Sequence, residues 1–188
     1  MITHKGTETI NTDRLILRRY KSDDTSNMYK NWASCSEVTK FLSWAPHTDE
    51  EFTKKLISEW ISEYEDKKTY HWVIELKENK KVIGDISSFN LNDKHCSCEI
   101  GYCLSRDYWN SGIMSESLNS VINYLFKIGF NRIVAMHDTS NPASGQVMLK
   151  NNMKYEGTLR QAHKLRGNSE FSDLSIYSIL KSEWNNNK

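Results

Sequence analysis

The sequence predicts an α+β domain with a mostly antiparallel sheet and elements in the order βααβββαβαββ. Short runs of strand-forming residues, bounded by turn residues, occur on both sides of a central helix. That helix is indicated by apolar residues spaced as on one face of an amphipathic helix: Met114, Leu118, Val121, Ile122 and Leu125. We expect one domain over residues 1–188, with an ordered core from about 12 to 184.

The first half of the chain predicts one strand, two helices and a β-hairpin. The second helix is expected to begin with a capping box, Thr48-Asp-Glu-Glu51, in which Thr48 is the N-cap. The other expected elements are a strand at 15–17, a helix at 22–33, and strands at 71–76 and 82–89 that turn at 78–80.

The second half predicts a strand at 96–104 and a helix from Gly112 to near Gly129, which fits a C′ residue. A strand at 132–137 follows. Asn141 is then expected as N-cap and Pro142 as the first residue of a helix that runs to about residue 152. The last expected elements are strands at about 153–164 and 172–181, joined by a turn at 166–169.

The composition narrows the class of protein. The 188 residues are 38% hydrophobic, and 25 basic residues against 24 acidic ones leave a formal charge of +1, so no basic excess favours nucleic acid. The absence of an 18-residue apolar run predicts no membrane span, and the N-terminus has no apolar signal region. We therefore expect a cytoplasmic protein with reduced cysteines. His95, Cys96 and Cys98 match no usual zinc spacing, so no metal is expected.

The stretch Asp107-Tyr-Trp-Asn-Ser-Gly-Ile-Met-Ser-Glu-Ser-Leu118 is the most informative part of the chain. It passes from a strand through a small-residue turn into a helix, and a helix N-terminus offers unpaired N–H groups at the positive end of the dipole. Such a place suits phosphate oxygens. The P-loop and dinucleotide glycine patterns are absent. Taken alone, the turn is equally well explained as a helix start without a ligand.

The same stretch resembles the acetyl-CoA-binding segment of the GNAT superfamily of N-acetyltransferases, in the branch of the Rim-type ribosomal-protein N-acetyltransferases. Tyr108-Trp-Asn-Ser-Gly-Ile-Met-Ser-Glu-Ser117 stands where that branch has Tyr-Trp-Gly-Lys-Gly-x-Met/Ala-Thr/Ser-Glu-Ala. Further similar segments are Thr12-Asp-Arg-Leu-Ile-Leu-Arg18, Glu99-Ile-Gly-Tyr102 and Asn141-Pro-Ala-Ser144. Tyr155-Glu-Gly-Thr-Leu-Arg160 and residues 176–184 resemble the closing strands of the branch. The resemblance implies a V-shaped mixed sheet and direct transfer of acetyl from acetyl-CoA to an amine.

The resemblance also implies where acetyl-CoA binds. Its pyrophosphate would lie on the backbone N–H groups of a cradle formed by Asn110, Ser111, Gly112, Ile113, Met114 and Ser115. Its pantetheine arm would pair with the strand edge at Tyr102, Cys103 and Leu104, and would be bonded by Asn141. Asn110-Ser111 replaces the branch's Gly-Arg or Gly-Lys, so a cation for the phosphates is missing and we expect weaker binding.

Two residues are candidates for the chemistry. Glu99 would accept a proton from the amine, directly or through water; the alternative is a strand glutamate that only faces solvent or pairs with a basic residue. Ser144 would protonate the departing thiolate, although serine is also ordinary in a first helical turn. His137 and Asp138 are lower-ranked alternatives for the base.

The preferred acceptor is the N-terminal α-amine of a protein, such as a ribosomal protein. A polyamine, an amino acid or an aminoglycoside is the alternative within the same class, and residues 41–47 with Tyr155, Arg160 and His163 would select among them. A non-catalytic acyl-CoA-binding module, or a protein-binding domain without a CoA site, remains a different class. A homodimer through the edge of the closing strands is possible, and sedimentation would test it.

Overall fold

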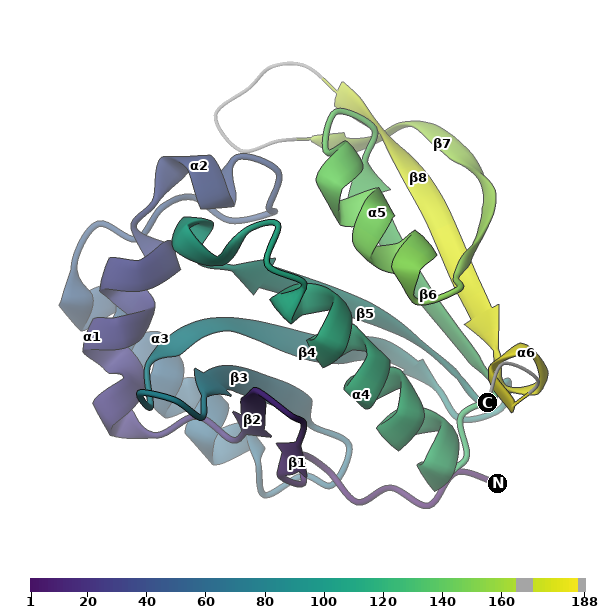
Figure 1. Cartoon of the computed structure of the whole chain (residues 1–188), viewed down its shortest axis with the longest axis horizontal. Coiled ribbons are helices and arrows are strands. Elements are labelled where there is room, and N and C mark those ends of the chain that lie inside the picture. The colour runs from purple at the N-terminus through teal and green to yellow at the C-terminus, as the bar shows by residue number, and fades with distance from the viewer. Residues whose placement is uncertain (165–170, 186–188) are drawn as a thin grey trace.

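A computed structural model describes residues 1–164 and 171–185, with no side chain described for Asn185. Its centre is an eight-stranded sheet in the order β1-β2-β3-β4-β5-β6-β8-β7 (Figure 1). The strands are β1 (Ile10–Asn11), β2 (Leu15–Arg18), β3 (Tyr70–Leu76), β4 (Val82–Asn92), β5 (Ser97–Leu104), β6 (Arg132–Asp138), β7 (Lys154–Lys164) and β8 (Phe171–Leu180). Only the β5–β6 pair is parallel among these strands. The α+β class and the mostly antiparallel sheet are thus confirmed.

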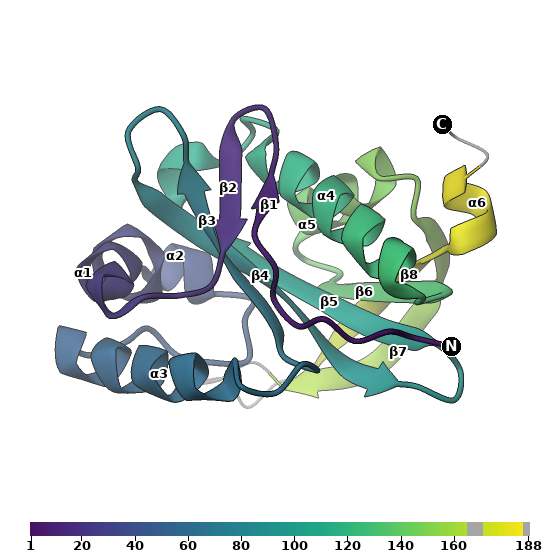
Figure 2. The same cartoon turned by 90° about the horizontal axis from the view of Figure 1, so that it is seen from below.

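Helices cover both faces of the sheet (Figure 2). On one face lie α4 (Ile113–Ile128) and α5 (Pro142–Lys150); on the other lie α1 (Thr25–Met28), α2 (Ser36–Thr39) and α3 (Glu50–Glu63). The remaining helical segments are η1 (Ser22–Asp24), η2 (Tyr29–Ala33), η3 (Arg106–Tyr108) and α6 (Lys181–Asn185). None of the helices described is both long and apolar enough to cross a membrane.

Helix α4 follows the predicted pattern closely. Its five stripe residues are all buried against the sheet: Met114, Leu118, Val121, Ile122 and Leu125. Burial of such a side chain contributes about 1.5–3 kcal/mol, which fixes the orientation of the helix. Gly112 and Gly129 bound the helix with left-handed backbone, at φ 78° and 117°. The buried stripe and the left-handed Gly112 together place the start of α4 beyond the end of β5.

The sheet opens between β5 and β6. Their parallel pairing runs from Ser97–Arg132 only as far as Ile100–Ala135. Beyond that point β5 stays paired with β4 up to Leu104, and β6 stays paired with β8 up to Asp138. Each strand keeps its outer partner and the two arms diverge, as Figure 1 shows. This gap is the V-shaped opening that the resemblance implied.

Two expected elements need correction, and two short elements were not expected. Residues 181–184, which the resemblance placed in a closing strand, form part of α6 instead, and this places Trp184 against Phe126 of α4 with ring centroids 6.2 Å apart. The predicted helix at 22–33 is divided into η1, α1 and η2. The short β1 and α2 were not predicted. The predicted turn at 166–169 lies outside the described residues.

The capping box predicted at Thr48 is also wrong by one residue. Asp49 is the N-cap of α3, and its Oδ1 accepts the backbone N–H of Phe52 at 2.7 Å. The Thr48 hydroxyl donates to Asp49 Oδ2 instead of capping the helix. Thr and Asp are both good N-caps, so adjacent residues of these types leave the boundary open in the sequence.

Candidate functional site

The turn before α4 concentrates unpaired backbone donors. Asn110 and Gly112 are both left-handed, at φ 59° and 78°. The first intrahelical bond is from Glu116 N–H to Gly112 O at 3.0 Å. Within residues 1–164 and 171–185, none of the six N–H groups of residues 110–115 has an acceptor. Consecutive N–H groups at a helix start form an anion-binding concavity, so this turn has the chemistry of a phosphate site.

The six residues of the turn differ in what their side chains do. Asn110, Ser111 and Gly112 are exposed, Ser115 is half-buried, and Ile113 and Met114 are buried in the core beneath the turn. The apolar pair therefore anchors the turn to the sheet, while the others leave the backbone open to solvent.

The edge of β5 offers backbone groups to the gap. Ser105 N–H donates to Ile83 O at 2.7 Å across the β4–β5 ladder. Because antiparallel bonding alternates along a strand, the backbone groups of Tyr102 and Leu104 point to the other side, where β6 has diverged. Leu104 O is taken by Trp109 Nε1 at 2.9 Å. The free groups at the gap are thus the N–H groups of Tyr102 and Leu104 and the Tyr102 carbonyl.

Cys103 lies on the β4 side, in a buried polar cluster that the sequence did not indicate. Its thiol donates to Asp85 Oδ1 at 3.2 Å, and Tyr20 Oη donates to Asp85 Oδ2 at 2.6 Å. His71 Nε2 lies 3.5 Å from the same carboxylate. Burial and then Asp85 raise the pKa of the Cys103 thiol, so it remains protonated and is no nucleophile. The cluster is a structural support for the strands beside the gap.

The start of α5 lies across the gap from Tyr102. The Tyr102 hydroxyl donates to Ser144 O at 3.0 Å and shares a hydrogen bond of 3.1 Å with Ser144 Oγ. Burial raises the pKa of Tyr102, so its hydroxyl stays protonated. Asn141 occupies the N-cap position as predicted, but its side chain makes no capping bond. Its amide group therefore remains available to a ligand.

His137 and Asp138 end β6 beside the same helix start. His137 Nδ1 donates to Asp138 O at 2.8 Å, and its buried Nε2 has no partner among the described residues. A Cβ on Gly145 would stand 2.6 Å from that nitrogen, so the glycine makes room for the ring. Asp138 Oδ1 accepts the Ser140 N–H at 2.8 Å and organises the turn into α5. Both residues have a structural explanation.

Glu99 pairs with Val134, just before the gap opens, and its side chain lies on the opposite face of β5 from that of Tyr102. It shares strand parity with Cys103, which packs among residues of α1 and α3, whereas Tyr102 packs toward α4. One carboxylate oxygen of Glu99 accepts the side-chain amide of Asn90. The structure thus separates the two catalytic candidates, with Glu99 on the α1–α3 face and Ser144 on the α4–α5 face.

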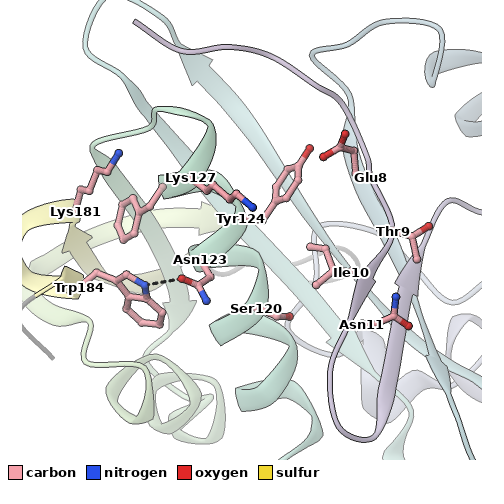
Figure 3. A pocket seen from close by; sticks show the side chains of 11 residues that line it. Glu8, Thr9, Ile10, Asn11, Ser120, Asn123, Tyr124, Lys127, Lys181 and Trp184 are labelled. Atoms are coloured by element: carbon pink, nitrogen blue, oxygen red, sulfur yellow. Dashed lines mark hydrogen bonds between the residues drawn. The ribbon is translucent and has the colours of Figure 1, made fainter. Parts of the chain in front are cut away.

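A surface pocket of about 710 Å³ lies away from all of these residues. Figure 3 shows it between the N-terminal segment, the outer side of α4 and α6, with Tyr124, Lys127 and Trp184 in its wall. None of the predicted site residues lines it. No group of three His, Cys, Asp or Glu side chains suited to a metal occurs among the described residues.

The chain belongs to the GNAT family of acetyltransferases. A family model for the acetyltransferase (GNAT) domain matches residues 14–154. The uncharacterized N-acetyltransferase YoaA of Bacillus subtilis is 33% identical over 173 residues, which cover 92% of this chain and 96% of that protein. The ribosomal-protein-serine acetyltransferase of Escherichia coli is 33% identical over 101 residues, or 53% of this chain and 55% of that protein.

A solved structure has the same fold. It is RimL, a ribosomal L7/L12 α-N-protein acetyltransferase in complex with coenzyme A, with a TM-score of 0.82 and 24% identity over 92% of this chain and 98% of that one. The family and its relatives identify this protein as an N-acetyltransferase.

Proposed function

We propose that the protein transfers the acetyl group of acetyl-CoA to the N-terminal α-amine of a protein such as a ribosomal protein. The observation that carries the proposal is the row of six unpaired N–H groups at residues 110–115, placed just beyond the end of β5 where the sheet opens. A pyrophosphate on that row would leave the pantetheine arm at the gap.

The relatives support both the proposed acetyl donor, acetyl-CoA, and the proposed acceptor, a ribosomal protein. RimL, which has the same fold, is described as bound to coenzyme A and as acting on a ribosomal protein. The Escherichia coli relative is named for a ribosomal protein as well. An acceptor of that kind would place the reaction in the cytoplasm.

The gap supplies groups for each part of the reaction. The arm would pair with Tyr102 and Leu104 as an added strand, and Asn141 would bond it from the α5 side. A free N–H of β5 would polarise the thioester carbonyl as negative charge develops on its oxygen. Binding at these fixed groups places the acetyl carbon and the amine together, which can be worth about 10⁵ M or more in effective molarity.

Proton transfers complete the step. The amine nitrogen forms a bond to the acetyl carbon and the carbon–sulfur bond breaks. Glu99 takes the proton that the amine loses, directly or through water, and Ser144 gives a proton to the departing thiolate. The two residues lie on opposite faces of the sheet, so acceptor and cofactor can approach the gap from different sides.

An α-amine suits this site because it demands little of the base. Its pKa is about 7.7–8.0, against about 10.4 for a lysine side chain, so a substantial fraction is already deprotonated near neutral pH. A carboxylate such as Glu99 is sufficient for the remaining proton transfer.

The test is turnover of acetyl-CoA against a panel of amines, with the acceptors analysed by mass spectrometry. The panel contains peptides with Ser, Ala and Met N-termini, peptides with internal lysine, spermidine, free amino acids and an aminoglycoside. We expect a gain of one acetyl group on the α-amine of a peptide. Acetylation confined to the small amines would contradict the proposed acceptor, and binding of acetyl-CoA without turnover of any acceptor would favour a non-catalytic module.

A further inference from the structure

A positively charged side chain from elsewhere in the chain lies beside the cradle formed by residues 110–115, which contains no basic residue. Asn110 and Ser111 carry no positive charge, but Arg14, in the turn between β1 and β2, reaches the same place. Its NH1 donates to Ser111 O at 3.0 Å. Its NH2 lies 3.5 Å from the point where a Cβ on Gly112 would stand. The guanidinium therefore borders the row of unpaired N–H groups.

Glu116, in the first turn of α4, holds Arg14 in that position. Arg14 Nε donates to Glu116 Oε2 at 2.7 Å, while Oε1 accepts the Arg14 N–H at 3.1 Å and the Thr12 hydroxyl at 2.6 Å. Burial alone would raise the pKa of Glu116, but the bonds from Thr12 and Arg14 and the charge of Arg14 lower it, so the carboxylate is ionised. The side chain of Arg14 is thus ordered before any ligand arrives.

Most of the donor capacity of Arg14 remains unused. A guanidinium has five N–H donors, and Glu116 and Ser111 occupy one on Nε and one on NH1. The other three have no acceptor in residues 1–164 and 171–185, and the side chain is 49% exposed. Arg106, the nearby arginine of η3, is instead paired with Glu37 at 2.5 Å. Arg14 combines a fixed position, free donors and contact with the cradle.

We propose that Arg14 binds the pyrophosphate of the acyl-CoA, with Glu116 as the residue that positions it. The guanidinium fork matches phosphate oxygens in shape as well as in charge. Arg14 thereby replaces the cation that is missing at 110–111. This role rests on the proposed function, because it requires that the turn at 110–115 is the pyrophosphate cradle.

A pair of ligands isolates the pyrophosphate. Acetyl-CoA contains it, whereas S-acetylpantetheine has the same acetyl group and arm but no phosphates. We would titrate both into the wild type, Arg14→Gln and Arg14→Lys, and follow tryptophan fluorescence, because Trp109 precedes the cradle and is 46% exposed. Lys54→Gln is the control of equal charge change, since Lys54 is an exposed residue of α3 on the other face.

We expect Arg14→Gln to weaken acetyl-CoA binding by about tenfold or more, the effect of losing hydrogen bonds to a charged group, and to leave S-acetylpantetheine unchanged. The acetyl-CoA affinity of Arg14→Lys should lie between those of the wild type and Arg14→Gln, because lysine keeps the positive charge but lacks the forked guanidinium group. Lys54→Gln should bind both ligands as the wild type does. Equal weakening of both ligands by Arg14→Gln, or of neither, would overturn the role of Arg14.

Glu116→Gln separates phosphate binding from structural support. This variant removes the negative charge of residue 116 but keeps Arg14 and an oxygen that can accept its hydrogen bond. It should therefore retain most of the preference for acetyl-CoA over S-acetylpantetheine. If Glu116→Gln instead weakens acetyl-CoA and S-acetylpantetheine to the same extent, Glu116 is only a structural tie between the β1–β2 turn and α4, and its positioning role fails. A wild type that binds no acetyl-CoA would overturn the proposed function itself, and this outcome is visible before any variant is made.

Discussion

Helices α4 and α5 follow the two strands that border the gap, yet their first turns are different. At α4 the six N–H groups of residues 110–115 have no acceptor among the described residues. At α5 the N–H groups of Asn141 and Ser144 are bonded to Asp138 O and Asn141 O, Pro142 has none, and Ala143 alone among residues 141–144 has an N–H without an acceptor in the described residues. A helix N-terminus is therefore not by itself a phosphate site. What matters is whether the local backbone has already satisfied its donors.

The same contrast applies to side chains. Arg14 brings positive charge to the start of α4. The start of α5 receives instead the protonated hydroxyl of Tyr102, which bonds to Ser144. We infer that the α4 end binds the anionic part of the cofactor, while the α5 end handles its thiol.

The largest effect is expected from Glu99→Gln, which separates chemistry from binding at either helix. Loss of a general base should lower kcat by about 10²-fold or more, without changing acetyl-CoA affinity. The loss should be greatest at low pH, where less of the amine is deprotonated. The measurement is a pH–rate profile, with Glu59→Gln on the exposed side of α3 as control. A profile identical to that of the wild type would remove Glu99 from the mechanism.

Ser144→Ala tests the role given to the α5 end. Tyr102 can still donate to the carbonyl of residue 144, so the helix start should be preserved. We expect kcat to fall by about 10²-fold, with the dissociation constant of acetyl-CoA unchanged. Stopped-flow turnover and equilibrium titration give the two quantities. Weaker binding with normal kcat would mean that Ser144 serves only to hold the cofactor.

Substitution of the two glycines at these helix starts should affect different properties: acetyl-CoA affinity at Gly112 and stability at Gly145. In Gly112→Ala, a left-handed backbone costs about 1–2 kcal/mol and disturbs the cradle, so acetyl-CoA affinity should fall. In Gly145→Ala, a Cβ 2.6 Å from His137 Nε2 should lower the free energy of unfolding by about 1–3 kcal/mol. Urea unfolding and a titration with acetyl-CoA compare them. An affinity loss confined to Gly145→Ala would reverse the contrast between the helices.

The smallest effect is expected outside both helix starts, at Asp85. Burial would raise the pKa of this carboxyl, but His71, Tyr20 and Cys103 together lower it below its usual value. A carboxyl whose folded-state pKa is lowered stabilises the protein above its unfolded pKa, and this stabilisation is lost as pH falls through the folded value.

Urea unfolding at pH 6 and at several values down to pH 3 would measure this effect. Asp85→Asn should have a shallower loss of stability with acid than the wild type, and should leave the ratio of acetyl-CoA to S-acetylpantetheine affinity unchanged. Asp23→Asn, at an exposed position, is the matched control. Equal acid slopes in Asp85→Asn and the wild type would contradict the role of this carboxylate.

The sequence predicted elements whose signals are local. Gly112 and Gly129 mark the ends of α4 because both need left-handed backbone, and the apolar stripe between them gives its buried face. The β3–β4 hairpin was also confirmed, because its strands and turn are likewise indicated by neighbouring residues. The boundary of α3 was missed because Thr48 and Asp49 are chemically similar caps, and the structure chooses the second.

Contacts between distant residues were beyond the reach of sequence patterns. Arg14 meets Ser111 across 97 positions, and Tyr102 meets Ser144 across 42. Periodicity carries no information on such pairs, because it reports only on neighbours along one element. The sequence could therefore indicate the turn at 110–115 as a phosphate site and at the same time suggest that it lacks a cation. Likewise, the resemblance placed Trp184 in a closing strand, whereas it belongs to α6 and is buried against α4.

The contrast between the two helix starts can be tested in one experiment on the unmodified protein. Backbone amide signals, assigned by NMR with ¹⁵N labelling, would be followed during titration with acetyl-CoA and, separately, with inorganic pyrophosphate. We predict that both ligands shift the amides of residues 110–115 most, and that only acetyl-CoA also shifts those near Ser144. Pyrophosphate shifts centred on residues 141–145, or acetyl-CoA shifts that bypass 110–115, would contradict it.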